Sequence, residues 1–238
     1  MSKVIEKIGK FIVLDGIDGA GKGTQIELLR KRLVEEGVSL RVFDFPRYEE
    51  SMAGALVGKM LKGDFGNPAD ISPYLTCLPY ICDQVNGSRE IREWVESGGL
   101  ALSNRYFTSN VHQIGKIKEE PARDEYRNWL WKFGYEEMGI LRPDLVVILL
   151  VDLPICRENV EKKAVRNYVG GQGADVVERD VNYQMEAAKE FRRMVAENGE
   201  WWVAIECCRE GQLMRPEEIG ELVYEEINRR GMLKSNDG

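Results

Sequence analysis

Short runs of apolar residues alternate along the chain with longer stretches in which apolar residues recur every three or four positions. Apolar runs of about 4–8 residues are typical of buried strands, and the longer spacing is typical of helices. Their alternation predicts an α/β fold, with a parallel sheet and helices on both faces. The expected strands are Phe11–Asp15, Leu40–Phe43, Leu100–Ser103, Leu145–Val151 and Trp201–Ile205. The run Leu145–Val151 is apolar throughout, which indicates a central strand buried on both faces of the sheet.

The expected helices lie between the strands. The stretch from Ile71 to Glu96 contains Pro73 and Pro79, so we expect it to be kinked or broken. The other expected helices are Thr24–Glu36, Pro121–Met138 and one that begins at Pro216. Four aromatic residues in the second of these are expected to pack in the core: Tyr126, Trp129, Trp131 and Phe133.

A glycine-rich break runs from Tyr168 to Ala174, between two strongly charged helical stretches. In an enzyme that handles phosphate, a flexible loop with basic flanks indicates a lid, here at about residues 160–176. An ordinary surface loop is the alternative. We expect residues 1–230 to form one domain and the tail after Arg230 to be disordered.

Composition narrows the classes of partner. The chain has 238 residues, a net charge of -7 and a pI of about 5.1. Nucleic acid and anionic membranes attract basic surfaces, so neither is expected as the main partner. The five cysteines form no CxxC pair, which favours free thiols in a reducing cytosol. Charged residues interrupt the first ten positions, so we expect no signal peptide and a cytoplasmic protein.

The strongest motif is Gly16-Ile-Asp-Gly-Ala-Gly21-Lys22, placed between an expected strand and an expected helix. Glycines let backbone N–H groups curl around an anion, and the helix N-terminus adds its dipole. Lys22 is placed to reach the β- and γ-phosphates of a nucleotide. The P-loop pattern has Ser or Thr directly after the lysine, whereas this chain has Gly23. The residues expected to bind ATP here are Gly16, Gly19, Gly21, Lys22, Gly23 and Thr24.

Four further segments follow in order along the chain: Phe45-Pro-Arg47-Tyr48, Cys82-Asp83-Gln84, Asn104-Arg105-Tyr106 continuing to Asn110, and Asp175–Asp180. With the P-loop, their order and spacing resemble the thymidylate kinases over about residues 8–230. The resemblance implies a P-loop NTPase fold with a five-stranded parallel sheet. It also implies transfer of the ATP γ-phosphoryl group to dTMP, a homodimer, and Mg²⁺ held mainly by nucleotide and water, with Thr24 nearby.

The resemblance also implies roles for individual residues. Lys22, Asp18 and Arg105 are the expected catalytic residues, and Asp18 is expected to align the acceptor. Arginines near the acceptor phosphate offset its repulsion from ATP and can clamp it in a bidentate way. The residues expected to bind the acceptor are Asp18, Phe45, Arg47, Tyr48, Gln84, Arg105, Asn110 and Gln113. Because Ala20 occupies the variable P-loop position, the lid should supply cations to ATP, with a charged solvated face as the alternative. The candidate lid cations are Arg157, Lys162, Lys163 and Arg166.

Two departures from the family pattern matter, and the resemblance also places one further residue. Asn104 stands where the family has an aspartate, so a negative charge is lost. Gln84 stands where an arginine reads the thymine edge, and its amide can both donate to and accept from a pyrimidine. His112, the only histidine, falls near the sugar or base pocket by the same resemblance.

Two other functions remain open. Adenylate kinases share the GKGTQ sequence, but the FPRY and NRYFTS segments and the short lid favour the thymidylate kinase reading. Asn104 and Gln84 instead leave room for a catalytically degenerate paralogue that only binds nucleotides. An assay with a panel of monophosphates separates these possibilities.

Overall fold

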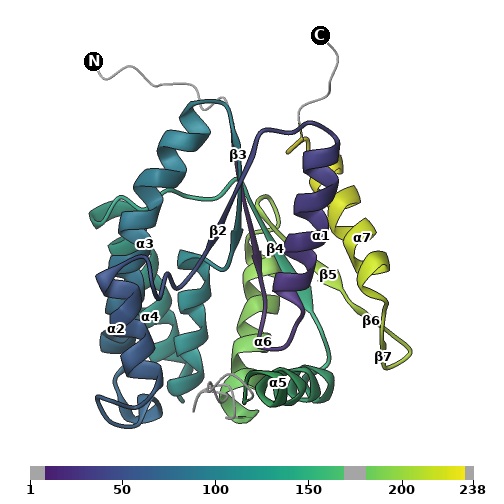
Figure 1. The fold of residues 1–238 in the computed structure, drawn as a ribbon. Helices are drawn as coiled ribbons and strands as arrows, with labels where there is room; N and C mark the ends of the chain where they lie inside the picture. The colour runs from purple at the N-terminus through teal and green to yellow at the C-terminus, as the bar shows by residue number, and fades with distance from the viewer. Residues whose placement is uncertain (1–8, 169–180, 234–238) are drawn as a thin grey trace, which may run out of the picture.

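The computed structural model describes residues 9–168 and 181–233. Its centre is a five-stranded parallel sheet with the strand order β2-β3-β1-β4-β5 (Figure 1). The strands are β1 (Lys10–Asp15), β2 (Leu40–Asp44), β3 (Leu100–Asn104), β4 (Leu145–Leu150) and β5 (Trp202–Glu206). All five expected strands are present, and the predicted fold class is confirmed.

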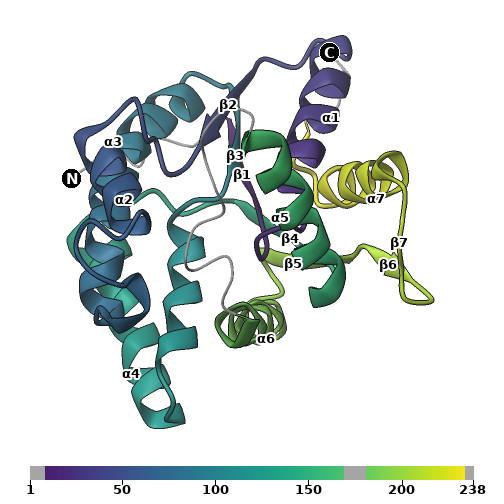
Figure 2. The ribbon, with the colours of Figure 1, turned by 60° about the horizontal axis from the view of Figure 1, so that its bottom comes forward.

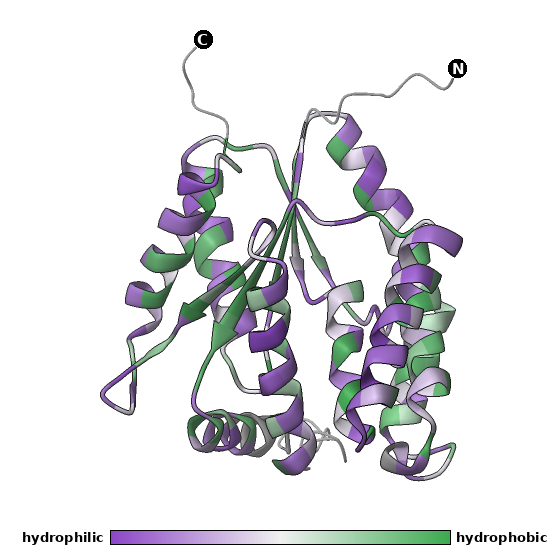
Figure 3. Cartoon of the chain, turned by 180° about the vertical axis from the view of Figure 1, so that it is seen from behind, coloured by the Kyte–Doolittle hydropathy of each residue, from purple (hydrophilic) through white to green (hydrophobic). Residues whose placement is uncertain are grey.

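The sheet is built around its two most apolar strands. From Phe11 to Leu14, β1 has no exposed side chain, and β4 is buried along its whole length. Strands covered on both faces need apolar side chains on both faces, which explains their continuous apolar sequences. Figure 3 shows these strands as the hydrophobic centre of the molecule, whereas the helices around them carry hydrophilic residues on their outer sides.

Helices cover both faces of the sheet. Helices α1 (Lys22–Glu35) and α7 (Pro216–Arg229) lie side by side on one side, and α2 (Met52–Leu61), α3 (Pro73–Glu96) and α4 (Glu120–Trp131) lie on the other (Figure 1). Helix α6 (Val181–Glu197) packs on β5 and on a 3₁₀ helix, η2 (Phe107–Lys116). Among the described residues, no helix combines the length and apolar character needed to cross a membrane.

Two helical stretches differ from what the sequence predicts. A kink or a break is expected in this stretch, and the break does not occur: α3 continues through Pro79 as a single helix. Buried side chains on either side of it, Cys77 and Ile81, hold both halves against the core. Helix α4 ends at Trp131 and continues into a π-helical turn, η3 (Lys132–Glu137). The four aromatic residues of this region belong to the core or pack against it, as expected.

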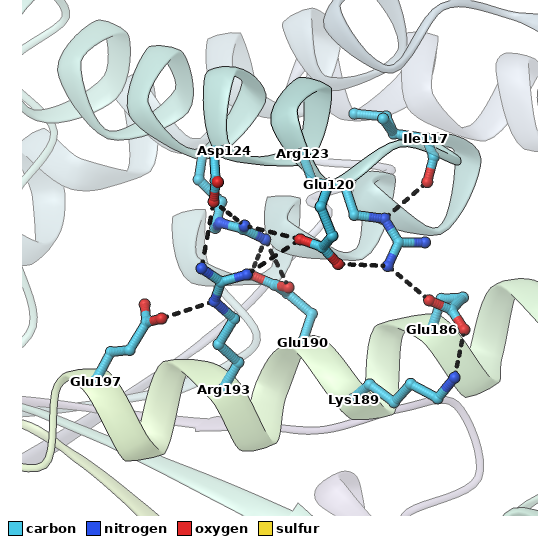
Figure 4. Close-up of polar contacts among 10 residues, drawn as sticks. Ile117, Glu120, Arg123, Asp124, Glu186, Lys189, Glu190, Arg193 and Glu197 are labelled. Carbon is cyan, nitrogen blue, oxygen red and sulfur yellow. Dashed lines mark hydrogen bonds and ion pairs between the residues drawn. The ribbon is translucent and has the colours of Figure 1, made fainter.

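Helices α4 and α6 are joined by ion pairs (Figure 4). At the centre, Arg127 of α4 pairs with Glu190 of α6 at 2.9 Å, and both side chains are almost fully buried. Arg123 pairs with Glu186 at 2.8 Å toward one end, and Arg193 pairs with Asp124 at 3.2 Å toward the other. A buried charge that loses its partner is costly, so this ladder fixes how the two helices lie against each other.

The remaining elements lie at the periphery. Helix α5 (Leu153–Tyr168) crosses the end of the molecule near the P-loop, as Figure 2 shows, and a short hairpin joins β6 (Cys208–Arg209) to β7 (Gln212–Leu213). The predicted lid begins within α5, and its residues 169–176 lie outside the described part of the chain. Met232 and Leu233 pack against the core, so ordered packing extends past Arg230. The five cysteines are free.

Candidate functional site

The P-loop lies between the end of β1 and the start of α1. Gly16, Gly19 and Gly21 all have positive φ angles, which L side chains rarely adopt. At Gly19 a Cβ atom would lie 2.1 Å from the carbonyl oxygen of Cys156, so only glycine fits there. Helix α1 begins at Lys22 without a side-chain cap, which leaves its first N–H groups available to an anion.

Lys22 is folded back onto the loop that carries it. Its Nζ donates to the carbonyl oxygens of Gly16 at 2.9 Å and Ile17 at 2.8 Å. The side chain is buried, and this burial, together with the nearby Arg105 cation, lowers the pKa of Lys22 to about 8. A lysine held at the P-loop by exchangeable hydrogen bonds can turn toward a bound phosphate.

Asp15 at the end of β1 and Asp18 of the P-loop both lie beside Arg105, which follows the end of β3. Leu14 pairs with Asn104 in the sheet, which brings Arg105 beside the P-loop. Arg105 Nη2 pairs with Asp18 Oδ1, and Nη1 lies 3.4 Å from Asp15 Oδ1. Burial raises the pKa of the Asp15 carboxyl, although Arg105 and Lys22 act to lower it. Burial also acts to raise the pKa of Asp18. There the effect of the Arg105 and Lys22 cations is larger, and the pKa of Asp18 lies well below its usual range.

The backbone of Arg105 is itself unusual. Its φ angle is 60°, a left-handed conformation that costs free energy for any residue with a Cβ atom. Its amide donates to the carbonyl oxygen of Leu14 at 3.0 Å, and its own carbonyl accepts from Ser103 Oγ at 2.6 Å. These bonds hold the strained residue in place, and strain of this kind is concentrated at functional sites.

A pocket opens beside Arg105, at the carboxyl ends of the parallel strands, where α/β sheets bind ligands. It brings together seven of the eight residues expected to bind the acceptor: Asp18, Phe45, Tyr48, Gln84, Arg105, Asn110 and Gln113. His112, Lys116 and Tyr183 also line it. The residues expected from the sequence therefore gather around one pocket, to which Lys116 and Tyr183 add lining residues that the sequence did not indicate.

Arg47 is the expected acceptor residue that does not line this pocket. Its side chain is buried, and its Nε and Nη1 donate to Asp83 Oδ1 at 3.0 Å and Glu90 Oε1 at 2.7 Å. Nη2 donates to the backbone carbonyl of Asp83 at 3.2 Å. With every guanidinium nitrogen engaged on α3, Arg47 anchors the FPRY segment to that helix in this structure.

Inside the pocket, Gln84 and Asn110 form a linked amide pair. Asn110 Nδ2 donates to Gln84 Oε1 at 2.8 Å, and Gln84 Nε2 donates to the carbonyl oxygen of Tyr106 at 3.2 Å. Tyr126 also donates to the backbone carbonyl of Asn110 at 3.0 Å. The pair offers both donors and acceptors to a planar ligand, and its two members are held in fixed orientations.

Gln184 was not found from the sequence, because no motif marks it. It comes from α6 and is buried. Its Nε2 donates to Asp18 Oδ2 at 3.0 Å, and its Oε1 accepts from the Asp18 amide at 3.3 Å. Gln184 therefore bonds to one carboxylate oxygen of Asp18 while Arg105 bonds to the other, and the ion pairs between α4 and α6 fix the helix that carries Gln184.

The predicted cations of the lid lie on α5. Arg157 and Lys162 are exposed, and Lys162 Nζ lies 2.7 Å from Glu158 Oε1 one turn away. The side chains of Lys163 and Arg166 lie outside the described part of the structure. Their expected role toward ATP stays a prediction. Thr24 is exposed in the first turn of α1, where a phosphate-bound metal ion could reach its hydroxyl.

His112 is buried in the pocket wall, and we expect it to stay neutral. Burial first, and then the neighbouring Arg105 cation, lower the pKa of its imidazole to about 3. The resonances of this single imidazole should therefore not titrate near pH 6.5 in the folded protein, whereas they should in urea. The burial of neutral His112 carries no cost in the free energy of unfolding above about pH 6.5. As the pH falls from there toward about 3, the unfolded state gains a proton that the folded state does not, and the free energy of unfolding decreases. An NMR midpoint of about 6–7 in the folded state would contradict this prediction.

Comparison with known proteins gives one family. The sequence model described as thymidylate kinase matches residues 14–209. The thymidylate kinase of Mycobacterium tuberculosis is 27% identical over 194 residues, which cover 81% of this chain and 89% of the relative. A probable thymidylate kinase of Pyrobaculum aerophilum is 27% identical over 220 residues, covering 92% and 96%.

Among solved structures, the thymidylate kinase of Candida albicans matches with a TM-score of 0.70 and 18% identity, covering 94% of this chain and 93% of that one. That likeness shows the shared fold. The family model spans most of the chain and includes the P-loop lysine, the FPRY segment and the NRY segment. This chain belongs to the thymidylate kinase family.

Proposed function

We propose that the protein transfers the γ-phosphoryl group of ATP to dTMP and releases ADP and dTDP. The observation that carries this proposal is the position of Arg105, which bonds to P-loop aspartates and also lines the adjacent pocket. One cation at the boundary of two sites can bring two like-charged phosphates together. That is the main task of a protein in phosphoryl transfer.

The chain's own groups divide this task. The P-loop amides and Lys22 hold the β- and γ-phosphates of ATP, and Arg105 holds the phosphate of the acceptor. An acceptor phosphate oxygen forms a bond to the γ-phosphorus as the bond to the β-phosphate oxygen breaks. Asp18, fixed by Gln184, keeps Arg105 in place. The Gln84–Asn110 pair faces the base, and Arg47 anchors the FPRY segment.

The metal ion would be held by the nucleotide more than by the protein. Among residues 9–168 and 181–233, no cluster of three or more His, Cys, Asp or Glu side chains could hold an ion. Thr24 at the start of α1 offers a hydroxyl beside the phosphates, which fits Mg²⁺ bound to ATP and water. When bound, Mg²⁺ neutralises charge on the β- and γ-phosphates.

A coupled assay of ADP formation, run with dTMP, dUMP, dCMP, dGMP and AMP, tests the proposed function. We expect dTMP to give the highest kcat/KM. Preference for AMP would support the adenylate kinase alternative. Binding of nucleotides without turnover of any monophosphate would show a degenerate paralogue.

Asn104→Asp tests whether the missing family aspartate matters. Asn104 Nδ2 donates to Asp44 Oδ1 at 2.9 Å, a bond that a carboxylate could not donate. Because Asp15 already places a carboxylate beside the P-loop, we expect kcat and its Mg²⁺ dependence to change by less than about tenfold, ~1.4 kcal/mol of barrier. The matched control combines Asn104→Asp with Asp44→Asn, which moves the carboxylate and keeps the net charge. If the native protein is inactive and Asn104→Asp restores transfer, it is a degenerate paralogue.

We also propose a cytoplasmic homodimer, as the family resemblance implies. Sedimentation at micromolar concentration should then show twice the mass of the chain. A monomer under these conditions would contradict the proposed assembly without affecting the proposed reaction.

A further inference from the structure

Lys116 links two elements that line the pocket. It belongs to η2, and its own side chain lines the pocket as well. Its Nζ donates to the carbonyl oxygens of Pro68 at 2.6 Å and Ile71 at 3.3 Å, and to Thr76 Oγ1 at 2.7 Å. Two of these acceptors lie in the α2–α3 segment (residues 62–72), and the third lies in the first turn of α3. An ammonium group has three protons, so protein oxygens take up its whole donor capacity.

The charge of Lys116 comes at a cost in free energy. All three acceptors are uncharged, and burial lowers the pKa of Lys116 to about 8. Moving an ammonium group partly out of water is unfavourable, and uncharged oxygens offset less of that cost than a carboxylate does. An apolar side chain would avoid the cost but would make none of these bonds. The lysine therefore serves to hold three points of the neighbouring chain at once.

The part of η2 that carries Lys116 is itself held in place. At Gly115 a Cβ atom would lie 2.8 Å from the ring of Tyr183, so η2 and α6 are in close contact there. On the other side in sequence, the carbonyl oxygen of Ile117 accepts from Arg123 Nε at 2.8 Å. Lys116 therefore extends from a fixed element, and its bonds determine where the α2–α3 segment lies.

The α2–α3 segment also has local hydrogen bonds. The amide of Gly66 donates to the carbonyl oxygen of Gly63 at 3.0 Å, and the amide of Asp70 donates to that of Asn67 at 3.0 Å. Each bond joins residues three positions apart, so it shapes the segment without setting its distance from η2. The bonds from Lys116 cross between the two elements and set that distance.

The position of the α2–α3 segment matters because it forms part of the pocket. Pro68 lines the pocket, as do Leu61 and Thr76 on either side of the segment. We propose that Lys116 is a positioning residue that holds the α2–α3 segment against η2 and so keeps the pocket closed around the bound acceptor. This inference rests on the proposed function, because it takes the pocket to be the site of a nucleoside monophosphate. A segment that covers a bound substrate excludes water and completes the site.

Lys116→Met tests this role, because it nearly keeps the length of the side chain and removes its donors. We expect the KM for dTMP to rise by about tenfold or more, since part of the pocket wall is no longer held. At saturating dTMP, kcat should stay within about threefold, and the KM for ATP within about twofold. Lys116→Arg keeps the charge and several donors, and it should restore part of the affinity for dTMP.

Thr76→Val distinguishes positioning from direct contact with the nucleotide. It removes one acceptor of Lys116 and leaves the lysine in place. If Lys116 acts through the neighbouring chain, the KM for dTMP should rise severalfold. The double variant should then be no worse than Lys116→Met alone, because both substitutions break the same link. A native KM in Thr76→Val, or additive losses in the double variant, would overturn the proposal.

Hydrogen–deuterium exchange measures the link in the absence of nucleotide. The amides of Asp70 and Thr76 are both hydrogen-bonded, and Lys116→Met should speed their exchange by at least about fivefold. Lys62→Met is the matched control, because Lys62 lies in the same segment and its side chain is exposed. It should leave both the exchange rates and the KM for dTMP unchanged. Native exchange rates in Lys116→Met, or an equal increase in Lys62→Met, would contradict the role given to Lys116.

Exchange and calorimetric binding of dTMP separate this inference from the proposed function. If the native protein binds dTMP without phosphorylating it, and Lys116→Met weakens binding and speeds exchange, only the proposed reaction fails. If the native protein phosphorylates dTMP but Lys116→Met keeps the native KM, only the role of Lys116 fails. If the native protein neither binds nor phosphorylates dTMP, both fail. Should thermal unfolding show that Lys116→Met is not folded, the KM of Thr76→Val decides.

Discussion

Replacing Lys22 by alanine should lower kcat by at least about a thousandfold, ~4 kcal/mol of barrier. The Nζ group is the charged donor of the P-loop, and charge on the transferring phosphoryl group is greatest in the transition state. Among the described residues, the same group donates hydrogen bonds to the carbonyl oxygens of Gly16 and Ile17. Because those oxygens belong to the loop itself, the fold should survive the substitution. Steady-state kinetics with saturating ATP and dTMP give the measurement.

Lys31→Ala is the control for this experiment. Lys31 lies on the same helix, is 60% exposed and pairs with Glu27 at 3.7 Å, so its loss should leave kcat nearly unchanged. Thermal unfolding of both variants shows whether each is folded. A folded Lys22→Ala protein with near-native turnover would end the assignment of this loop to ATP.

The sheet could be predicted from the sequence because its strands are buried on both faces. Observed β4 spans Leu145–Leu150 where the apolar run predicts Leu145–Val151, and β1 begins one residue earlier than predicted. Such strands must be apolar at every position, so the pattern and the structure have one cause. Strand order places the ends of β1 and β3 side by side, which is why two distant motifs form one site.

Side-chain direction could not be predicted in the same way. The sequence shows that Arg47 follows β2. It does not show that the Arg47 guanidinium donates to Asp83, which lies 36 positions away in the chain. Gln184 reaches Asp18 across 166 positions without any motif. Contacts of this kind depend on how α3 and α6 pack, and that packing is set by many side chains together. Pro79 is a related case: local chemistry predicts a kink or a break there, and α3 stays continuous with buried residues on both sides of the proline.

Three features of the structure lead us to expect that the proposed acceptor site depends most on Arg105. Its guanidinium contacts Asp15 and Asp18, its side chain reaches the pocket, and its left-handed backbone is fixed by hydrogen bonds. Arg105→Ala removes the cation but also leaves Asp15 and Asp18 without their arginine partner. Arg105→Lys keeps a charge without the bidentate geometry, so the pair separates loss of charge from loss of shape.

We expect Arg105→Ala to lower kcat/KM for dTMP by roughly 2–5 kcal/mol of transition-state stabilisation, because truncating one side of a buried charge pair costs about this much. Arg105→Lys should recover only part of the loss. Calorimetric titration with an ATP analogue should show binding within about threefold of the native protein, because Lys22 and the loop amides remain. Arg229→Ala is the control: this exposed arginine pairs with Glu226 at 2.6 Å on α7, outside the pocket, and its loss should leave both measurements as in the native protein. Loss of ATP binding with an unchanged KM for dTMP would place Arg105 on the donor side of the site.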